Sequence, residues 1–147
     1  MMGGLSLINE RNVIRMKFPY PSVSSRLAVQ AHMYICKSAE QPRFSFVKCQ
    51  TLKPYKLINN PLKHFIDEPA DLARNPFERT TRIDCDKLFI TENVRYDDAL
   101  IATRRSDVCQ ELFDNVLAEL EQDGWEDISI ENEQELAQLN PLITFTE

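Results

Sequence analysis

The fold is decided by two neighbouring stretches, Arg26-Leu-Ala-Val-Gln-Ala-His-Met-Tyr-Ile-Cys-Lys37 and Phe44-Ser-Phe-Val-Lys-Cys-Gln-Thr51. The first runs for twelve residues without Gly or Pro, and apolar residues occupy every second position: Leu27, Val29, Ala31, Met33 and Ile35. In an extended chain this alternation places the apolar side chains on one face. The second stretch is rich in aromatic and β-branched residues, which is typical of a strand. We therefore predict an antiparallel hairpin.

The segment between the two stretches, residues 38–43, contains Pro42 and is predicted to be the turn of this hairpin. Arg26 and Thr51 then lie at the open end of the hairpin. Because antiparallel pairing brings the first and last residues of a hairpin together, we expect these two side chains to be close in space.

The remaining chain adds short strands and then one clear helix. Alternating residues predict strands over 13–18 and 80–89, and shorter ones over 62–67 and 99–102. Apolar residues at helical spacing follow Ser106, a good N-cap: Val108, Leu112, Phe113, Val116, Leu117 and Leu120. This order predicts a mainly β fold, an open and strongly bent antiparallel sheet or small barrel, closed by a C-terminal amphipathic helix.

Charge is distributed unevenly along the 147 residues. Residues 1–105 contain all 17 Lys and Arg with 11 acids, a balance of +6, whereas residues 106–147 contain 12 acids and no Lys or Arg. We expect one domain over residues 1–122 and an acidic tail over 123–147, with at most one short helix from Glu131 to Leu139. A basic body suits a polyanion such as RNA. The alternative, held as equal, is that the basic body and the acidic tail attract each other within one molecule, so that the tail can cover the basic surface.

Composition excludes several classes of protein. The 43% hydrophobic and 27% charged residues fit a soluble globular domain, and no apolar run approaches the ~20 residues of a membrane helix. The first eight residues lack the pattern of a signal peptide. The four cysteines form no Cys-x-x-Cys pair, so we expect reduced, packed cysteines, no metal site and no cofactor.

Four segments carry a resemblance to a known family. Residues 13–20 and 24–30 resemble the opening strand with its proline-bearing loop and the arginine-led start of the second strand. Residues 46–51 resemble a third strand ending in a phosphate-contacting Thr or Ser. Residues 80–89, followed by the helix, resemble the closing elements. Together, over residues 12–122, they resemble the PemK/Kid/MazF toxins of bacterial toxin–antitoxin systems.

The resemblance implies a small SH3-like barrel and a sequence-specific, metal-independent endoribonuclease. It also implies a cytoplasmic homodimer that acts on single-stranded RNA or mRNA, binds a cognate antitoxin protein and has no membrane association. It makes Arg26 the central phosphate-binding residue and Thr51 a hydroxyl donor to the phosphate.

RNA cleavage without a metal needs a base for the 2′-hydroxyl, a donor for the phosphate charge and an acid for the leaving 5′-oxygen. The Arg26 guanidinium is the best donor, because it can grip a phosphate with two hydrogen bonds. Asp86 is a candidate base or substrate-orienting acid, although a solvated acidic pair with Asp84 is the commoner explanation. His32 and His64 remain open, each with a structural alternative, so the sequence does not identify the base.

A basic and aromatic stretch follows the hairpin: Lys48, Lys53, Tyr55 and Lys56. Such interleaving suits single-stranded RNA, whose bases stack on aromatic rings while lysines follow the phosphates; a solvated loop is the simpler explanation. The family's Gly-Asp and Arg-Pro signatures are missing here, since Arg11-Asn12 and Leu27 stand in those places. A non-catalytic SH3-like barrel that binds a protein or a nucleic acid is therefore the alternative to the enzyme.

Overall fold

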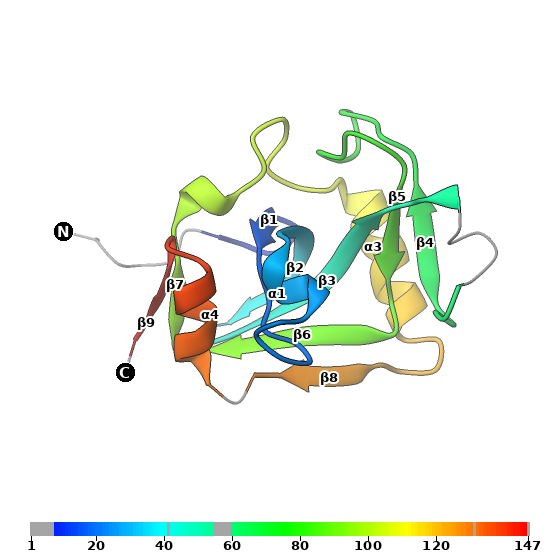
Figure 1. The fold of residues 1–147 in the computed structure, drawn as a ribbon. Coiled ribbons are helices and arrows are strands. Elements are labelled where there is room, and N and C mark those ends of the chain that lie inside the picture. Colours follow the sequence, from blue (N-terminus) through cyan, green and yellow to red (C-terminus); the bar gives the residue numbers. More distant parts are fainter. Residues whose placement is uncertain (1–7, 41, 55–59, 131, 147) are drawn as a thin grey trace.

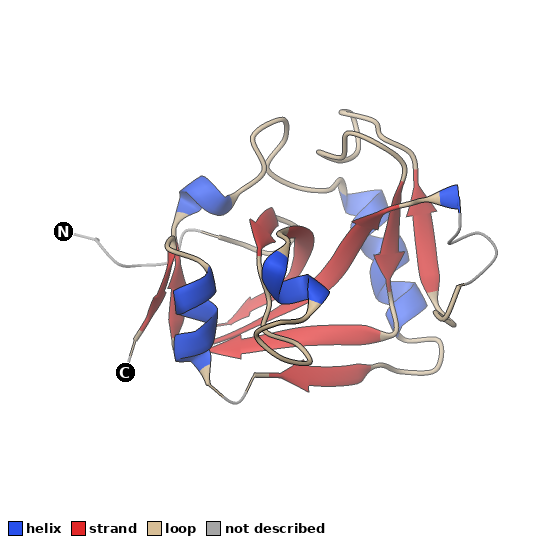
Figure 2. Ribbon diagram, in the orientation of Figure 1, coloured by secondary structure: helices blue, strands red, loops and turns tan. Residues whose placement is uncertain are grey.

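The structure is a computed structural model that describes residues 8–40, 42–54, 60–130 and 132–146. It is mainly β, with one large sheet, one two-stranded sheet and a few short helices (Figures 1 and 2). The strands are β1 Val13–Met16, β2 His32–Glu40, β3 Arg43–Thr51, β4 Phe65–Glu68, β5 Thr81–Asp84, β6 Lys87–Glu92, β7 Val94–Tyr96, β8 Glu126–Ser129 and β9 Ile143–Phe145. The helices are α1 Arg26–Val29, the 3₁₀ helix η1 Asp98–Leu100, α3 Gln110–Leu120 and α4 Glu133–Leu139.

The long strand β3 belongs to two branches of the seven-stranded sheet. Its first residues, from Arg43 to Phe46, pair with β6, and its last, from Cys49 to Thr51, pair with β5. The order β1-β2-β3-β5-β4 is antiparallel throughout, while β8 joins β6 in parallel. The branching leaves the end of β3 at the meeting point of β2, β5 and the loops before them, and this is where the candidate site lies.

The predicted hairpin is confirmed from His32 onward, but its predicted first residues are wrong. Met33 pairs with Cys49 and Ile35 with Val47, as expected for β2 and β3. The preceding residues form the short helix α1, in which the adjacent Leu27 and Ala28 are both buried. Two buried neighbours suit a helical turn, whereas in a strand with one solvent face they would point to opposite sides.

Two hydrophobic cores lie on the two faces of the sheet, so the middle of β2 is buried on both of its faces. Tyr34 and Cys36 belong to one core and Ile35 to the other, and none of the three is exposed. The first core holds an aromatic cluster in which the rings of Phe18 and Phe89 meet edge to face, 4.9 Å between centroids. The second core is covered by α3.

The helix α3 carries the predicted apolar stripe but begins at Gln110, with Cys109 rather than Ser106 as its N-cap residue. The earlier residues cannot join the helix because their backbone groups are paired elsewhere. The carbonyl of Ser106 accepts from Val13 N–H at 2.9 Å, and Val108 N–H donates to the carbonyl of Arg11 at 3.0 Å. The buried residues of the stripe are Val108, just before the helix, and Leu112, Phe113, Val116 and Leu120 within it. The strand predicted over residues 99–102 is also wrong, since η1 takes Ala99 and Leu100 and only Ile101 forms an isolated bridge, to Ile14.

The expected acidic tail is built into the molecule rather than appended to it. It contributes β8, α4 and β9, and Figure 1 shows α4 and β9 beside β7. Ile128, Leu136 and Ile143 are buried in the first core, which holds the aromatic cluster and is called the aromatic core below. The helix predicted from Glu131 to Leu139 is present as α4, whereas the flanking strands were not expected. The division of the chain at residue 122 stays a prediction.

All four cysteines are free, and three are buried: Cys36, Cys49 and Cys85. Burial raises the pKa of the Cys36 and Cys85 thiols to about 12, so these thiols stay protonated and pack as small apolar side chains. Within the described residues, none of the helices has the length and apolar character needed to cross a membrane.

Candidate functional site

Two adjoining pockets open where β2 and β3 end. One, of about 160 Å³, lies between β1, the β2–β3 pair and residues 77–81; the other, of about 200 Å³, lies between α1 and the end of β3. Ala31, His32, Gln50 and Thr51 line both of them. They therefore form one polar surface with His32 and Thr51 in the middle, which we call the hairpin-end site.

The structure brings together three of the residues that the sequence singled out. Arg26, Thr51 and Lys53 all line the second pocket. Arg26 reaches it from α1 and not from a strand, because the short helix turns the chain back towards the end of β3. The expected proximity of Arg26 and Thr51 is therefore found, although a different local structure produces it.

Asp86 and Lys48 lie elsewhere. The Asp86 carboxylate accepts hydrogen bonds from the backbone N–H groups of Lys63, at 2.8 Å, and His64, at 3.0 Å. The Lys48 ammonium lies 3.7 Å from Oδ2 of the buried Asp84. Neither side chain lines a pocket of the hairpin-end site, and both contacts hold the sheet together. Tyr55 and Lys56 fall outside the described residues.

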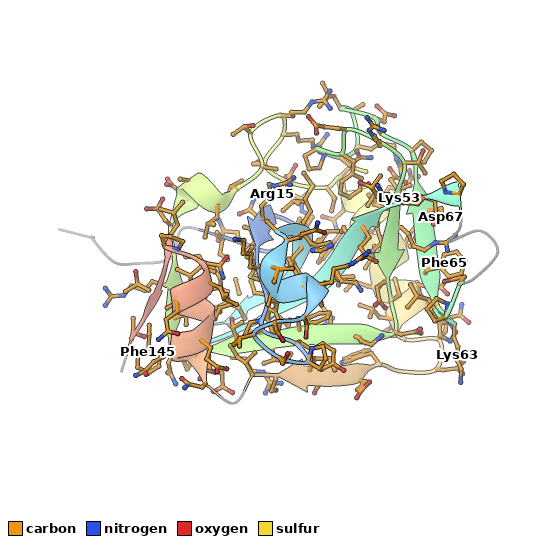
Figure 3. All side chains as sticks on the ribbon, in the orientation of Figure 1. Arg15, Lys53, Lys63, Phe65, Asp67 and Phe145 are labelled. Carbon is orange, nitrogen blue, oxygen red and sulfur yellow. The ribbon has the colours of Figure 1, made fainter. Side chains whose placement is uncertain are left out.

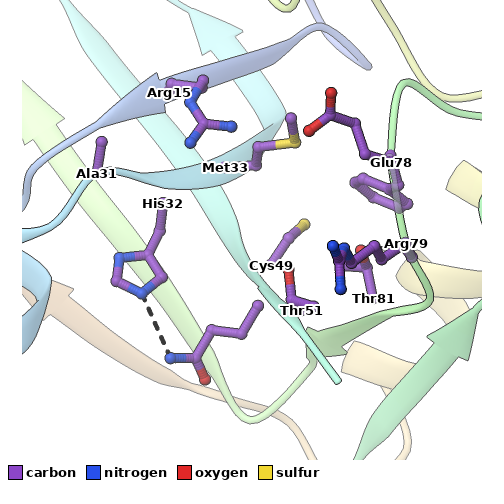
Figure 4. Close-up of a pocket in the computed structure, with 11 residues that line it drawn as sticks. Arg15, Ala31, His32, Met33, Cys49, Thr51, Glu78, Arg79 and Thr81 are labelled. Carbon is purple, nitrogen blue, oxygen red and sulfur yellow. Dashed lines mark hydrogen bonds between the residues drawn. The ribbon is translucent and has the colours of Figure 1, made fainter. Parts of the chain in front are cut away.

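The first pocket adds residues that sequence reasoning did not select, chiefly Arg15 and Arg79. Arg15 lies on the polar face of β1, and Figure 4 shows its guanidinium turned into the pocket. Arg79 comes from the long loop before β5. The alternation over residues 13–18 did mark Arg15 as outward-facing, but no sequence signal connects either arginine with Thr51.

The cations of the hairpin-end site differ from several other cations of the protein in their partners. Arg74, Arg82 and Arg105 each form an ion pair with a carboxylate. By contrast, no described carboxylate forms an ion pair with the four exposed cations of the site: Arg15, Arg26, Lys53 and Arg79. In Figure 3, Arg15 and Lys53 extend from β1 and from the chain just after β3. Four uncompensated cations around two adjoining pockets favour the binding of an anion.

The hydrogen bonds of His32 determine which ring nitrogen can exchange a proton. Its Nδ1 lies 3.0 Å from the carbonyl oxygen of Gln30, and because a carbonyl only accepts, Nδ1 carries a hydrogen. Its Nε2 lies 3.5 Å from the side-chain nitrogen of Gln50, the contact drawn in Figure 4. In the neutral ring Nε2 therefore holds the lone pair, and this is the nitrogen that gains and loses a proton inside the site.

The described residues contain no group of three or more His, Cys, Asp and Glu side chains placed to hold a metal ion. The donors of the hairpin-end site are instead guanidinium, ammonium, hydroxyl and amide groups. Such groups bind phosphate oxygens directly.

In comparisons with known proteins, no family model, curated protein or solved structure matches this chain. The resemblance to the PemK/Kid/MazF toxins therefore stays an interpretation of the residues.

Proposed function

We propose that this protein is a metal-independent endoribonuclease that cuts single-stranded RNA by attack of the 2′-hydroxyl on the adjacent phosphate. The observation that supports the proposal best is the hairpin-end site, where four uncompensated cations surround His32 and Thr51. Phosphodiester cleavage needs charge stabilisation on the phosphate together with proton transfer, and this surface offers both.

In this proposal Arg26 grips the non-bridging oxygens of the scissile phosphate, where negative charge grows as the 2′-oxygen attacks. The Thr51 hydroxyl donates a further hydrogen bond to the same phosphate. Lys53, which also lines the second pocket, contacts a neighbouring phosphate of the same RNA strand. Preorganised donors of this kind typically contribute a factor of about 10²–10³ each to the rate.

The resemblance extends the proposal to a biological setting. We propose a cytoplasmic toxin of a type II toxin–antitoxin system, active as a homodimer and neutralised by a cognate antitoxin protein. Cleavage of mRNA then arrests growth, and sequence specificity comes from base contacts beside the phosphate sites.

The test is incubation of the full chain with a long RNA of mixed sequence in excess EDTA. We expect discrete cleavage that leaves a 2′,3′-cyclic phosphate and a 5′-hydroxyl, and no cleavage of DNA of the same sequence. Arg26→Ala is the test variant, and Arg95→Ala, an exposed arginine of β7 outside both pockets, is the matched control. If the protein binds the RNA but does not cut it, the endoribonuclease proposal is wrong, and a non-catalytic nucleic-acid-binding protein takes its place.

A further inference from the structure

The hairpin-end site contains one carboxylate that the sequence did not suggest. Among the described residues that line the two pockets, Glu78 is the only acid. Figure 4 shows its carboxylate turned towards the pocket from the side opposite Arg15. No ion pair or hydrogen bond to another described residue engages this carboxylate, so its oxygens face the space where a substrate would lie.

The loop that carries Glu78 is held in place by buried contacts on its N-terminal side. Phe77 is only 2% exposed, and its N–H donates to Oδ1 of the fully buried Asn75 at 3.0 Å. The Asn75 amide in turn donates to the carboxylate of Glu68 at 2.8 Å and to the carbonyl of Pro69 at 3.0 Å. These contacts fix the backbone from which the exposed Glu78 side chain projects.

Glu78 and His32 reach the first pocket from different elements, the loop before β5 and the start of β2 (Figure 4). Arg15 from β1 and Arg79 from the same loop complete the charged groups around Glu78. In a phosphoryl transfer the attacking and leaving oxygens lie roughly in line across the phosphorus. The base and the acid must therefore lie on opposite sides of the phosphate. The Glu78 carboxylate and the His32 imidazole meet this requirement, because they lie on different walls of one pocket.

We propose that Glu78 is the general base and His32 the general acid of this site. They act on the phosphate that Arg26 and Thr51 bind, and Arg15 and Arg79 add positive charge around it. The inference rests on the proposed function and deepens it. The Glu78 carboxylate takes the proton of the 2′-hydroxyl as the 2′-oxygen forms its bond to phosphorus. The bond from phosphorus to the 5′-oxygen breaks, and that oxygen takes the proton that Nε2 carries when His32 is protonated, which leaves the neutral ring with its hydrogen on Nδ1. The products are a 2′,3′-cyclic phosphate and a 5′-hydroxyl.

Glu78→Gln and His32→Asn test the two roles. Asn places an amide nitrogen near the position of Nδ1, so donation to the Gln30 carbonyl is kept while the titrating nitrogen is lost. We expect each variant to lower kcat by about 10²–10⁴, the usual contribution of a general acid or base, with KM changed little. Glu78→Gln should also remove the acidic limb of the pH–rate profile, and His32→Asn the basic limb. Glu92→Gln, an exposed glutamate of β6 outside both pockets, is the matched control.

A substrate with sulfur in place of the leaving 5′-oxygen separates the acid from the base. A thiolate leaves without protonation, so this substrate should restore most of the activity of His32→Asn and none of that of Glu78→Gln. The opposite pattern, or a Glu78→Gln enzyme with the rate and pH profile of the wild type, would overturn the assignment while leaving the endoribonuclease in place. A folded wild-type protein that cuts no RNA would overturn both.

Discussion

The backbone N–H of Lys63 donates a hydrogen bond of 2.8 Å to Oδ2 of Asp86, and this contact joins the bend between β5 and β6 to the chain that leads into β4. The second carboxylate oxygen of Asp86 accepts from the N–H of His64 at 3.0 Å. Because both oxygens of the Asp86 carboxylate accept hydrogen bonds from backbone N–H groups, we infer that Asp86 has a structural role.

Replacing Asp86 by Ala should therefore lower stability and leave the chemistry unchanged. The loss of two hydrogen bonds to a charged acceptor should reduce the free energy of unfolding by about 2–4 kcal/mol, measured by urea denaturation. The rate constant per folded molecule should stay at the wild-type value. A stably folded Asp86→Ala protein without activity would contradict this prediction and support a catalytic role for Asp86.

A second prediction concerns Arg26, which lines the pocket next to Thr51. Arg26→Ala should relieve growth arrest in a bacterial host and reduce RNA cleavage by about 10²–10³, because a donor to the developing phosphate charge is lost. It should also lower the slope of log Kd against log salt concentration by about 0.7 for single-stranded RNA, the value expected for one phosphate contact.

Affinity is best measured on RNA with a 2′-deoxy nucleotide at the cleavage position, which cannot react. Arg95→Ala serves as the control, because Arg95 lies on β7, away from both pockets. A soluble, folded Arg26→Ala protein that is as toxic as the wild type would refute the assignment.

The sequence identified those parts of the site that lie near regular elements with clear periodicity. The β2–β3 pairing and the stripe of α3 are both local patterns, and the pairing predicted that Thr51 lies at the open end of the hairpin, where it lines both pockets. Arg15, Glu78 and Arg79 were not connected with them, because their proximity depends on how β1 and the loop before β5 pack on the sheet. Long-range packing of this kind leaves no trace in the spacing of residues along the chain.

A third prediction concerns His64, whose ring contacts two carboxylates at the end of α3. Nδ1 lies 3.1 Å from Oε2 of Glu119 and Nε2 lies 2.8 Å from Oδ2 of Asp123. The hydrogen bond to Glu119 and then that to Asp123 raise the pKa of His64 above its ordinary value. Protonated His64 can donate to both acids at once, so the charged ring ties β4 to the segment after α3.

The sign of the resulting pH dependence follows from the raised pKa. The stabilisation is fully present below the ordinary histidine pKa of about 6.5 and is lost as pH rises through the higher pKa of the folded state. His64→Gln should therefore be less stable than the wild type at pH 6, and the difference should shrink as pH rises above about 6.5. Urea denaturation of both proteins across this range measures it. A difference that stays constant with pH would show that the ring contributes only by packing.

The last prediction concerns the acidic tail, for which the sequence suggested a role in covering the basic surface. The described residues that line the hairpin-end site all precede position 82, while Leu136 of α4 is fully buried in the aromatic core and β8 extends the main sheet through β6. We therefore expect the tail to act on stability and not on RNA affinity.

Leu136→Ala should reduce the free energy of unfolding by about 2–5 kcal/mol, as other buried Leu-to-Ala changes do. Leu142→Ala, whose side chain is 41% exposed, should cost less than about 0.5 kcal/mol. Both proteins should bind RNA at low salt with the wild-type affinity, measured at a temperature where each is folded. Tighter RNA binding by a folded Leu136→Ala protein would instead show that the tail competes with RNA, because loosening its anchor would have freed the basic surface.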